Sequence, residues 1–168
     1  MAKTETALLA AGCFWGVQTY FDEVPGVVST EVGYSGGHVP KPTYEQVCTH
    51  QTGHAETVKI EFDPDRISYH DLLENFFRMH DPTTLDRQGL DVGSNYRSAI
   101  FYTSEQQKQE AERIIKQLTD AHKFKSPIVT EVTKAGEFYP AEEYHQKYFQ
   151  KTGHGACHVS PSEVDIHD

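Results

Sequence analysis

The transition at Gly12 is the sequence feature that most constrains how this 168-residue chain folds. Residues 6–11 form a short apolar run that is typical of a buried strand, and residues 14–21 have the pattern of a short helix. Cys13 therefore lies where a strand turns into a helix. Because backbone N–H groups at a helix start stabilise a thiolate, the sequence predicts a nucleophilic cysteine here. A buried structural cysteine is the alternative, because free cysteine is among the most buried residue types.

Strand and helix patterns alternate along the rest of the chain. The sequence predicts helices that follow the N-caps Ser68 and Ser104 and that cover residues 141–150, and further strands over residues 27–34, 55–62, 98–102 and 128–132. In the strand over residues 27–34, alternation places Val28, Val32 and Tyr34 on one face. This interleaving predicts an α/β (α+β) two-layer sandwich.

Two long loops, at about residues 39–53 and 81–95, interrupt this pattern. Loops of roughly 15 residues inside a compact domain are uncommon and usually functional, so we expect the chemistry on the loops around Cys13. Residues 152–168 contain too little apolar surface to pack firmly. We therefore expect a single domain over residues 1–168 whose last segment is a loose C-terminal tail.

The composition excludes several classes of protein. With 37% hydrophobic and 24% charged residues, the chain fits a globular domain long enough to bury one core. Its formal charge of −10 argues against nucleic acid or an anionic membrane as a partner. The apolar run before Cys13 is too short for an export signal, and no run approaches membrane-spanning length. We therefore expect a cytoplasmic enzyme.

Glu56 is the second candidate for chemistry. It alternates in step with Val58 and Ile60, so if those side chains point into the core, the carboxyl does too. An inward carboxyl is costly unless it is paired or protonated, and such burial raises its pKa and makes it a general acid. The alternative, a solvated side chain at a frayed strand start, stays open.

The remaining candidates lie on loops and in the tail. Tyr44 lies in the first long loop, and Asp91 and Tyr96 lie in the second or at its end. Cys157 lies in the glycine-bearing tail, where mobility suits a resolving cysteine that attacks a sulfenic acid formed elsewhere. We expect Cys48 to be a small buried apolar residue, which is the usual environment of a free cysteine. Three cysteines so far apart do not indicate a secreted disulfide framework.

Other chemistries fit the same residues less well. Two groups have the types and approximate spacing of zinc ligands, namely Cys48, His50 and His54, and His154, Cys157 and His158, but neither contains a paired C-x2-C arrangement. A papain-like hydrolase would need an oxyanion-forming glutamine before Cys13, and none precedes it. A redox-sensing or methionine-oxide-binding module without catalysis also remains open.

A series of motifs then extends over nearly the whole chain. They are, in order, Gly12-Cys13-Phe14-Trp15-Gly16, Val32-Gly33-Tyr34-Ser35-Gly36-Gly37, Tyr44-Glu45-Gln46-Val47-Cys48, Gly53-His54-Ala55-Glu56, His80-Asp81-Pro82-Thr83, and Asp91-Val92-Gly93 to Tyr96-Arg97-Ser98. In these motifs the chain resembles the A-type peptide methionine sulfoxide reductases. The resemblance implies a ferredoxin-like two-layer fold and reduction of the S epimer of methionine sulfoxide, free or in proteins. It implies no metal and no organic cofactor.

The resemblance also implies roles for particular residues. Cys13 would be the nucleophile and Glu56 the general acid. Phe14 and Trp15 would form the apolar pocket for the S-methyl group of the substrate. The sulfoxide oxygen would be held, directly or through water, by Tyr44, Asp91 and Tyr96.

The recycling of the enzyme follows from the same resemblance. Cys157 would condense with the sulfenic acid of Cys13 to a disulfide, which an external dithiol such as thioredoxin would reduce. Only one cysteine follows the catalytic core where many members carry two, so thioredoxin should attack the Cys13–Cys157 bond itself. Leu90 and His50 also depart from the family pattern, which often has asparagine and glycine there. We expect a structural role for Cys48 and a monomeric protein.

Overall fold

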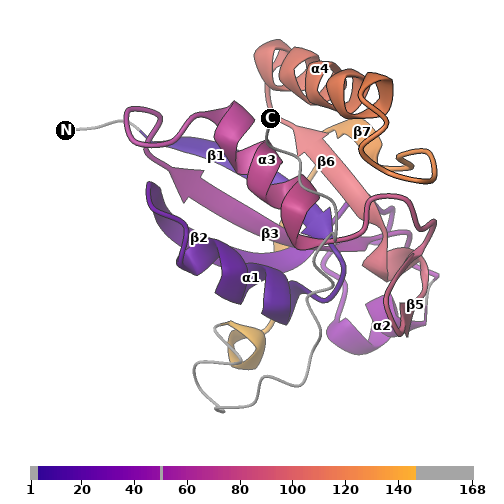
Figure 1. The fold of residues 1–168 in the computed structure, drawn as a ribbon. Helices are drawn as coiled ribbons and strands as arrows, with labels where there is room; N and C mark the ends of the chain where they lie inside the picture. Colours follow the sequence, from indigo (N-terminus) through magenta and orange to yellow (C-terminus); the bar gives the residue numbers. More distant parts are fainter. Residues whose placement is uncertain (1–3, 50, 147–168) are drawn as a thin grey trace.

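The computed structural model describes residues 4–49 and 51–146 as an α/β fold built on a mixed six-stranded sheet (Figure 1). The strands lie in the order β7-β6-β1-β3-β2-β8. Their bounds are β1 Glu5–Ala11, β2 Val27–Ser35, β3 Ala55–Phe62, β6 Ser98–Tyr102, β7 Glu131–Lys134 and β8 Tyr139–Pro140. Neighbouring strands are antiparallel except β6 and β7, which are parallel. The last two described strands, β7 and β8, thus lie at the two opposite edges of the sheet.

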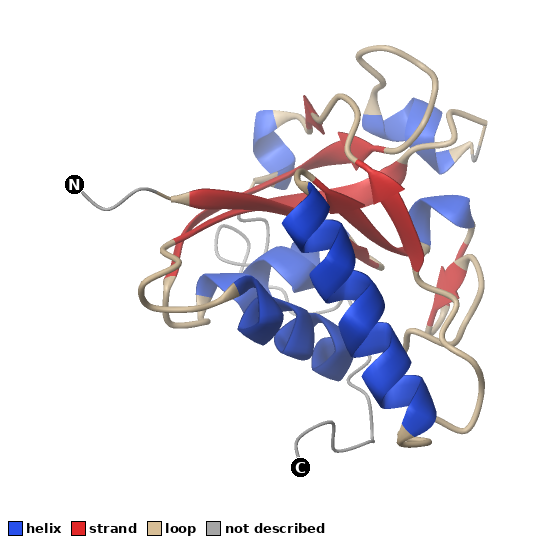
Figure 2. Ribbon diagram, turned by 90° about the horizontal axis from the view of Figure 1, so that it is seen from above, coloured by secondary structure: helices blue, strands red, loops and turns tan. Residues whose placement is uncertain are grey.

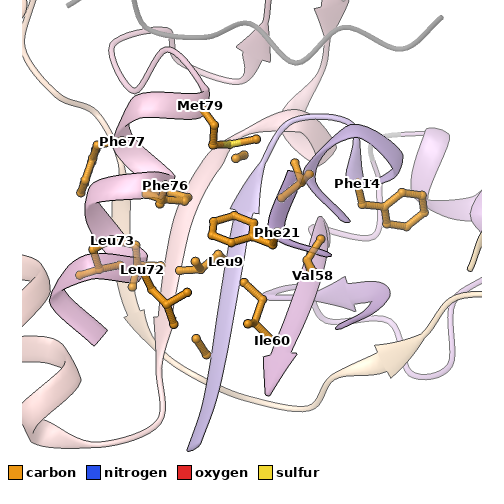
Figure 3. Close-up of a cluster of buried hydrophobic side chains, with 14 of the residues drawn as sticks. Leu9, Phe14, Phe21, Val58, Ile60, Leu72, Leu73, Phe76, Phe77 and Met79 are labelled. Atoms are coloured by element: carbon orange, nitrogen blue, oxygen red, sulfur yellow. The ribbon is translucent and has the colours of Figure 1, made fainter. Parts of the chain in front are cut away.

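Three helices cover one face of this sheet (Figure 2). They are α1 Phe14–Asp22, α3 Tyr69–Met79 and α4 Glu105–Asp120, while the shorter α2, Tyr44–Cys48, lies in the connection between β2 and β3. The main core lies between the three helices and the sheet, and Figure 3 shows Leu9 and Ile60 of the strands near Phe76 of α3. A smaller apolar cluster on the other face includes Leu8, Phe101 and the partly buried Phe138.

Local signals account for the helix starts. Ser68 caps α3 by accepting a hydrogen bond from the backbone N–H of Asp71 at 3.0 Å, and Ser104 caps α4 in the same way from Gln107 at 3.2 Å. Each cap satisfies one of the N–H groups that a helix start leaves without an internal partner. The apolar face of α3 is buried in full, with the side chains Leu72, Leu73, Phe76, Phe77 and Met79.

Two strand predictions need correction. The register of β2 against β3 shifts between Val27 and Ser29, so Val28 turns outward and is 59% exposed instead of sharing a face with the buried Val32. The last predicted strand, over residues 128–132, begins later, at Glu131. The residues before Glu131 contact the second long loop instead, where the N–H of Val129 donates to the carbonyl of Pro82 at 2.8 Å.

The two long loops contain structure that the apolar pattern did not predict. The first holds α2, which begins with a capping box in which Thr43 and Gln46 bond reciprocally. The second holds a hairpin of β4, Arg87–Gln88, and β5, Asp91–Val92, followed by the 3₁₀ turn η1, Ser94–Tyr96. Of the helix predicted over residues 141–150, the described part contains only the 3₁₀ turn η2, Glu143–His145. The expected tail over residues 152–168 lies outside the described residues.

Candidate active site

Cys13 is the residue at which β1 gives way to α1. It is the N-cap of α1, and its carbonyl accepts the N–H of Val17 at 3.3 Å, which closes the first turn. Gly12 makes this junction possible, because its φ of 102° is unfavourable for other residues and a Cβ there would lie 2.9 Å from the side chain of Gln88. The first turn of α1 contains no acidic residue. The half-buried Cys13 side chain therefore lies at the positive end of a helix dipole with no opposing charge in that turn.

Glu56 lies buried beside this helix start. It is 2% exposed, and its Oε1 accepts the backbone N–H of Phe14 at 3.1 Å while its Oε2 accepts the side-chain Nδ2 of Asn95 at 3.4 Å. Burial is the main cause that raises the pKa of the Glu56 carboxyl to about 8. The two hydrogen bonds act in the opposite direction and lower the pKa, while the charge of Asp91 adds to the rise. The predicted inward orientation is thus confirmed, and the alternative of a solvated carboxyl is wrong. At neutral pH this carboxyl is mostly protonated and holds a proton next to Cys13.

Two phenol groups face the same carboxyl. The pKa of Tyr96 is raised to about 12 by burial first and then by the charge of Glu56, and that of Tyr44 is raised by the same two causes. Asp91 also raises the pKa of Tyr96. The structure therefore brings Tyr44, Tyr96 and Asp91 to Glu56, although they come from two different loops. Both phenols remain protonated near neutral pH and can donate hydrogen bonds.

Phe14 and Trp15 belong to an aromatic cluster beside these polar groups. Phe14 is fully buried, with its ring centroid 5.7 Å from that of Tyr34 and 6.4 Å from that of Tyr44. Trp15 is half-buried and stacks on Tyr44 at 6.2 Å. The exposed part of this wall is therefore contributed by Trp15 and the half-buried Tyr44, while Phe14 supports them from below.

His145 completes this wall and was not among the predicted site residues. Its ring lies 4.4 Å from Tyr44 and 5.5 Å from both Phe14 and Trp15, measured between centroids. Its Nδ1 accepts the indole N–H of Trp15 at 3.1 Å, which requires that nitrogen to be unprotonated. Burial lowers the pKa of His145 and favours that neutral form. The sequence offered no signal for this role, because η2 is a single turn without periodicity.

Two further residues fix the first long loop, namely Glu142, which the sequence analysis missed, and His54, which it named only as a candidate zinc ligand and as part of a motif. Glu142 accepts hydrogen bonds from the hydroxyl of Tyr34 and from the backbone N–H of Tyr44, each at 3.2 Å. His54 accepts the N–H of Gly37 on Nδ1 at 3.0 Å and donates from Nε2 to the carbonyl of Val39 at 2.6 Å. These contacts anchor both ends of the loop, so that Tyr44 is presented to Glu56.

Of the other two cysteines, Cys48 lies within the described residues and Cys157 does not. Cys48 is a half-buried free thiol whose side chain hydrogen-bonds to Tyr44, and burial raises its pKa. Cys157 lies outside the described residues. The described part of the chain contains no group of three or more histidine, cysteine or acidic side chains that could hold a metal ion. His54, one of the candidate zinc ligands, uses both ring nitrogens on backbone groups.

Among the described helices, none is long and apolar enough to cross a membrane.

Comparison with known proteins agrees with this geometry. Residues 5–166 match the family described as peptide methionine sulfoxide reductase. The peptide methionine sulfoxide reductase MsrA of Methanosarcina acetivorans is 58% identical over 149 residues, which cover 89% of this chain and 79% of the relative. The crystal structure of Mxr1 from Saccharomyces cerevisiae in reduced form has a TM-score of 0.87 at 32% identity, covering 94% of this chain and 93% of that one.

A second structure of the yeast protein was determined in complex with Trx2. It matches with a TM-score of 0.60 at 25% identity and covers 87% of this chain and 85% of that one. The chain is thus similar to proteins of this family both in sequence and in fold. The chain belongs to the peptide methionine sulfoxide reductases.

Proposed function

We propose that this reductase acts on the S epimer of methionine sulfoxide, free or in proteins, with Cys13 as the nucleophile and Glu56 as the general acid. The observation that carries the proposal is the buried carboxyl of Glu56. It accepts the N–H of Phe14, the residue next to Cys13, and burial raises its pKa to about 8. The proton donor on β3 is thus held against the backbone of the residue that follows the nucleophile.

The reaction begins with polarisation of the sulfoxide. Its oxygen is a strong hydrogen-bond acceptor, and the protonated Glu56 with the hydroxyls of Tyr44 and Tyr96 supplies donors for it. Asp91 acts by raising the pKa of Glu56 and Tyr96, which keeps both protonated. Drawing electron density towards oxygen makes the sulfur electrophilic.

The chemical step is attack of the Cys13 thiolate on that sulfur. Glu56 transfers its proton to the sulfoxide oxygen, the oxygen passes to the Cys13 sulfur, and the products are methionine and a Cys13 sulfenic acid. Sulfur is thereby reduced in the substrate and oxidised in the enzyme by the same two electrons. The reaction needs no metal or organic cofactor.

The stereochemistry follows from the two walls of the site. The oxygen must point towards Glu56 and the phenols, and the methyl group must lie against the aromatic wall of Phe14 and Trp15. With these two substituents fixed, one configuration at sulfur would present the sulfur atom to Cys13. The resemblance of the motifs to the A-type reductases supports the S epimer as that configuration.

Recycling completes the cycle. Cys157 condenses with the Cys13 sulfenic acid, releases water and forms a disulfide, which a thioredoxin reduces by dithiol exchange. The complex of the yeast relative with Trx2 supports this partner. We further propose a cytoplasmic monomer with a single domain over residues 1–168, in which β6-β1-β3-β2 with α1 and α3 forms a ferredoxin-like core.

The deciding experiment measures methionine formed from each epimer of N-acetylmethionine sulfoxide, with dithiothreitol as the reductant. We expect product from the S epimer only. Product from the R epimer alone, or from neither, would refute the proposed substrate. Omitting the reductant should yield one disulfide per enzyme between Cys13 and Cys157, and peptide mapping that finds Cys48 in the bond instead would refute the resolving role.

A further inference from the structure

Asn95 is a buried polar side chain of the site to which the mechanism above gives no role. It lies in η1 and is 1% exposed. Its Nδ2 donates to Glu56 Oε2 at 3.4 Å. Its side chain also hydrogen-bonds to the phenol of Tyr96 and lowers the pKa of that group, so the amide is the donor there as well. One NH2 group therefore serves both Glu56 and Tyr96.

The oxygen of the same amide has no such use. Asn95 Oδ1 is buried, and none of the described residues hydrogen-bonds to it. A buried polar atom without a partner costs free energy, and in a native protein it calls for an explanation such as a catalytic role. The amide is therefore placed for its two N–H donors and not for the satisfaction of its own hydrogen bonds.

The segment that carries Asn95 is fixed to the sheet. The guanidinium of Arg97 donates to the carbonyl of Ser94, the first residue of η1, at 2.9 Å. The same guanidinium donates to Glu131 of β7 at 3.2 Å. Because η1 is tied to β7 and Asn95 is enclosed, the amide keeps its place beside Glu56.

The two hydrogen bonds leave the proton of Glu56 available. The partners of this carboxyl among the described residues are the backbone N–H of Phe14, at 3.1 Å from Oε1, and Asn95. Both are donors, and a protonated carboxyl has one O–H donor besides its acceptor sites. Neither partner therefore competes for the proton. The Tyr96 oxygen likewise accepts from Asn95 and keeps its hydrogen for another acceptor.

We propose that Asn95 is a positioning residue that directs the protons of Glu56 and Tyr96 at the sulfoxide oxygen. Its two N–H groups occupy one acceptor site on each oxygen, so that the O–H bonds face the substrate. Asn95 acts through these two groups and does not itself touch the substrate. Donors that are aimed before the reaction need no reorganisation in the transition state. The proposal rests on the proposed function and adds a residue that prepares its proton donors.

The first test replaces the amide by an apolar side chain of the same shape. Single turnovers with the S epimer of N-acetylmethionine sulfoxide measure methionine formation. In Asn95→Leu the maximal rate should fall about tenfold or more at about pH 6.5, which is less than the loss of a donor that contacts the substrate. The substrate concentration for half of that rate should change less than about twofold, because aimed protons stabilise the transition state and not the bound substrate.

The pH profile gives a readout that a loss of packing would not move. The Asn95 hydrogen bond lowers the pKa of Glu56, so its removal should shift the decline of the rate from about pH 8 to a value about one unit higher. The other titratable groups around this carboxyl are the same in both proteins. They are Cys13 before α1, Tyr34 on β2, Tyr44 and Cys48 on α2, Asp91 on β5 and Tyr96 on η1.

Asn95→Asp is the second variant. It keeps both shape and polarity, but an ionised carboxylate cannot donate. Its negative charge also opposes the ionisation of Glu56. The rate should therefore fall at least as much as in Asn95→Leu, and the decline should again move to higher pH.

Asn75→Leu is the matched control, because Asn75 is the only other asparagine in the chain. It lies on α3, where its Oδ1 accepts the hydroxyl of Tyr20 at 2.9 Å and its Nδ2 donates to the carbonyl of Asp71 at 2.9 Å. This variant also removes an amide that is bonded to a phenol. It should keep the wild-type rate and the wild-type pH profile.

A measurement on the wild-type protein does not depend on the folding of the Asn95 variants. The Nδ2 hydrogens of Asn95 give side-chain amide signals in NMR spectra, and Asn75→Leu identifies the signals of the other asparagine. One Asn95 hydrogen should move downfield as pH rises through about 8, because its hydrogen bond becomes charge-assisted when Glu56 ionises. Glu56→Gln should abolish this change.

Four results would overturn the proposal. They are an unchanged rate in Asn95→Leu, a fall in rate that is equal at every pH, an Asn95 signal that does not respond to pH in the wild-type protein, and a decline that moves to lower pH. The last result would show that the amide is turned by 180° and that Oδ1 accepts the Glu56 proton.

The wild-type enzyme separates failure of this proposal from failure of the proposed function. If it forms no methionine from the S epimer, the proposed function fails. If its rate does not decline above about pH 8, Glu56 is not the acid and the role of Asn95 fails with it. If the wild-type enzyme behaves as expected and Asn95→Leu and Asn95→Asp keep its profile, only the positioning role of Asn95 fails.

Discussion

The two ends of β3 carry the same residue type in opposite settings. Glu61, near one end, is half-buried and accepts the hydroxyls of Thr6 at 2.8 Å and Thr4 at 3.2 Å. Glu56, near the other end, is buried and is bonded by the backbone N–H of Phe14 and the side chain of Asn95. Glu61 thus accepts from the neighbouring strand β1 and from the residue just before it, whereas Glu56 accepts from the start of α1 and from η1.

This difference shows where a carboxyl becomes an acid. The half-buried Glu61 keeps contact with water as well as with the hydroxyls of Thr4 and Thr6. At Glu56 the segments that enclose the strand end bury the carboxyl, and the described residues supply two hydrogen-bond donors to it, so burial outweighs them and raises the pKa to about 8. The enclosing loops, and not the strand, give Glu56 its chemistry.

The largest expected effect that tests this comparison is on catalysis. Glu56→Gln keeps the shape and can donate a hydrogen bond but cannot transfer a proton, so the rate of methionine formation should fall about 10²- to 10⁴-fold. Single-turnover kinetics with the S epimer measure this step directly. Glu61→Gln is the control at the other end and should change the rate less than about twofold. Equal effects at both ends would show that the acid is another group.

The pH dependence of stability gives the second test. The folded state holds the Glu56 proton up to about pH 8, whereas the unfolded chain releases it near the ordinary value of 4.5. The folded state therefore binds more protons between these values, and the contribution of Glu56 to the free energy of unfolding falls as pH rises through this window. Urea unfolding at pH 5 and pH 8.5 should show this decrease, by a few kcal/mol, in the wild-type protein.

Two controls make that measurement specific. Glu56→Gln has no carboxyl proton to lose. Its free energy of unfolding should therefore decrease less between the two pH values than that of the wild-type protein. Glu61→Gln should retain the wild-type decrease. The rate of methionine formation should also decline as pH rises through about 8, because the protonated form of Glu56 is lost. If the free energy of unfolding changed between pH 5 and pH 8.5 by the same amount in the wild-type protein and in Glu56→Gln, the assignment would be contradicted.

The smallest expected effect concerns the aromatic wall. His145→Phe retains the ring against Tyr44 but removes the acceptor for the indole N–H of Trp15. Losing one hydrogen bond of this kind costs about 1 kcal/mol, so kcat/KM should fall roughly fivefold through a higher KM. Steady-state kinetics with N-acetylmethionine sulfoxide separate the two constants. A fall in kcat at constant KM would instead place His145 in the chemical step.

The predictions from sequence succeeded where the signals are local. The strand over 55–62 and the strand over 98–102 have the predicted bounds, because alternation of apolar residues specifies a half-buried strand within a few residues. The caps Ser68 and Ser104 were also predicted, since a cap hydrogen bond joins residues three apart in sequence.

The predictions failed where distant contacts decide the structure. The helix α2 was missed because it has no apolar period, and its first residue, Tyr44, is held by Glu142 from nearly a hundred residues away. The outward turn of Val28 results from a register shift against β3, which a single strand does not reveal. His145 was missed as a site residue for the same reason, because its partner Trp15 lies at the other end of the chain.

The sequence by itself determined the alternation of strands and helices and the position of Cys13 at a helix start, and it left an inward Glu56 as one of two alternatives. Each of these depends on residues within one turn or a few strand positions. Only the tertiary structure decided which groups surround Glu56 and what covers Trp15. Phe14, Asn95, Tyr44 and His145 meet there because the sheet order brings β1, β3 and β2 together and the loops close over that end. The raised pKa of Glu56 is therefore a property of the enclosed space, since desolvation depends on the whole surroundings and not on neighbours in sequence.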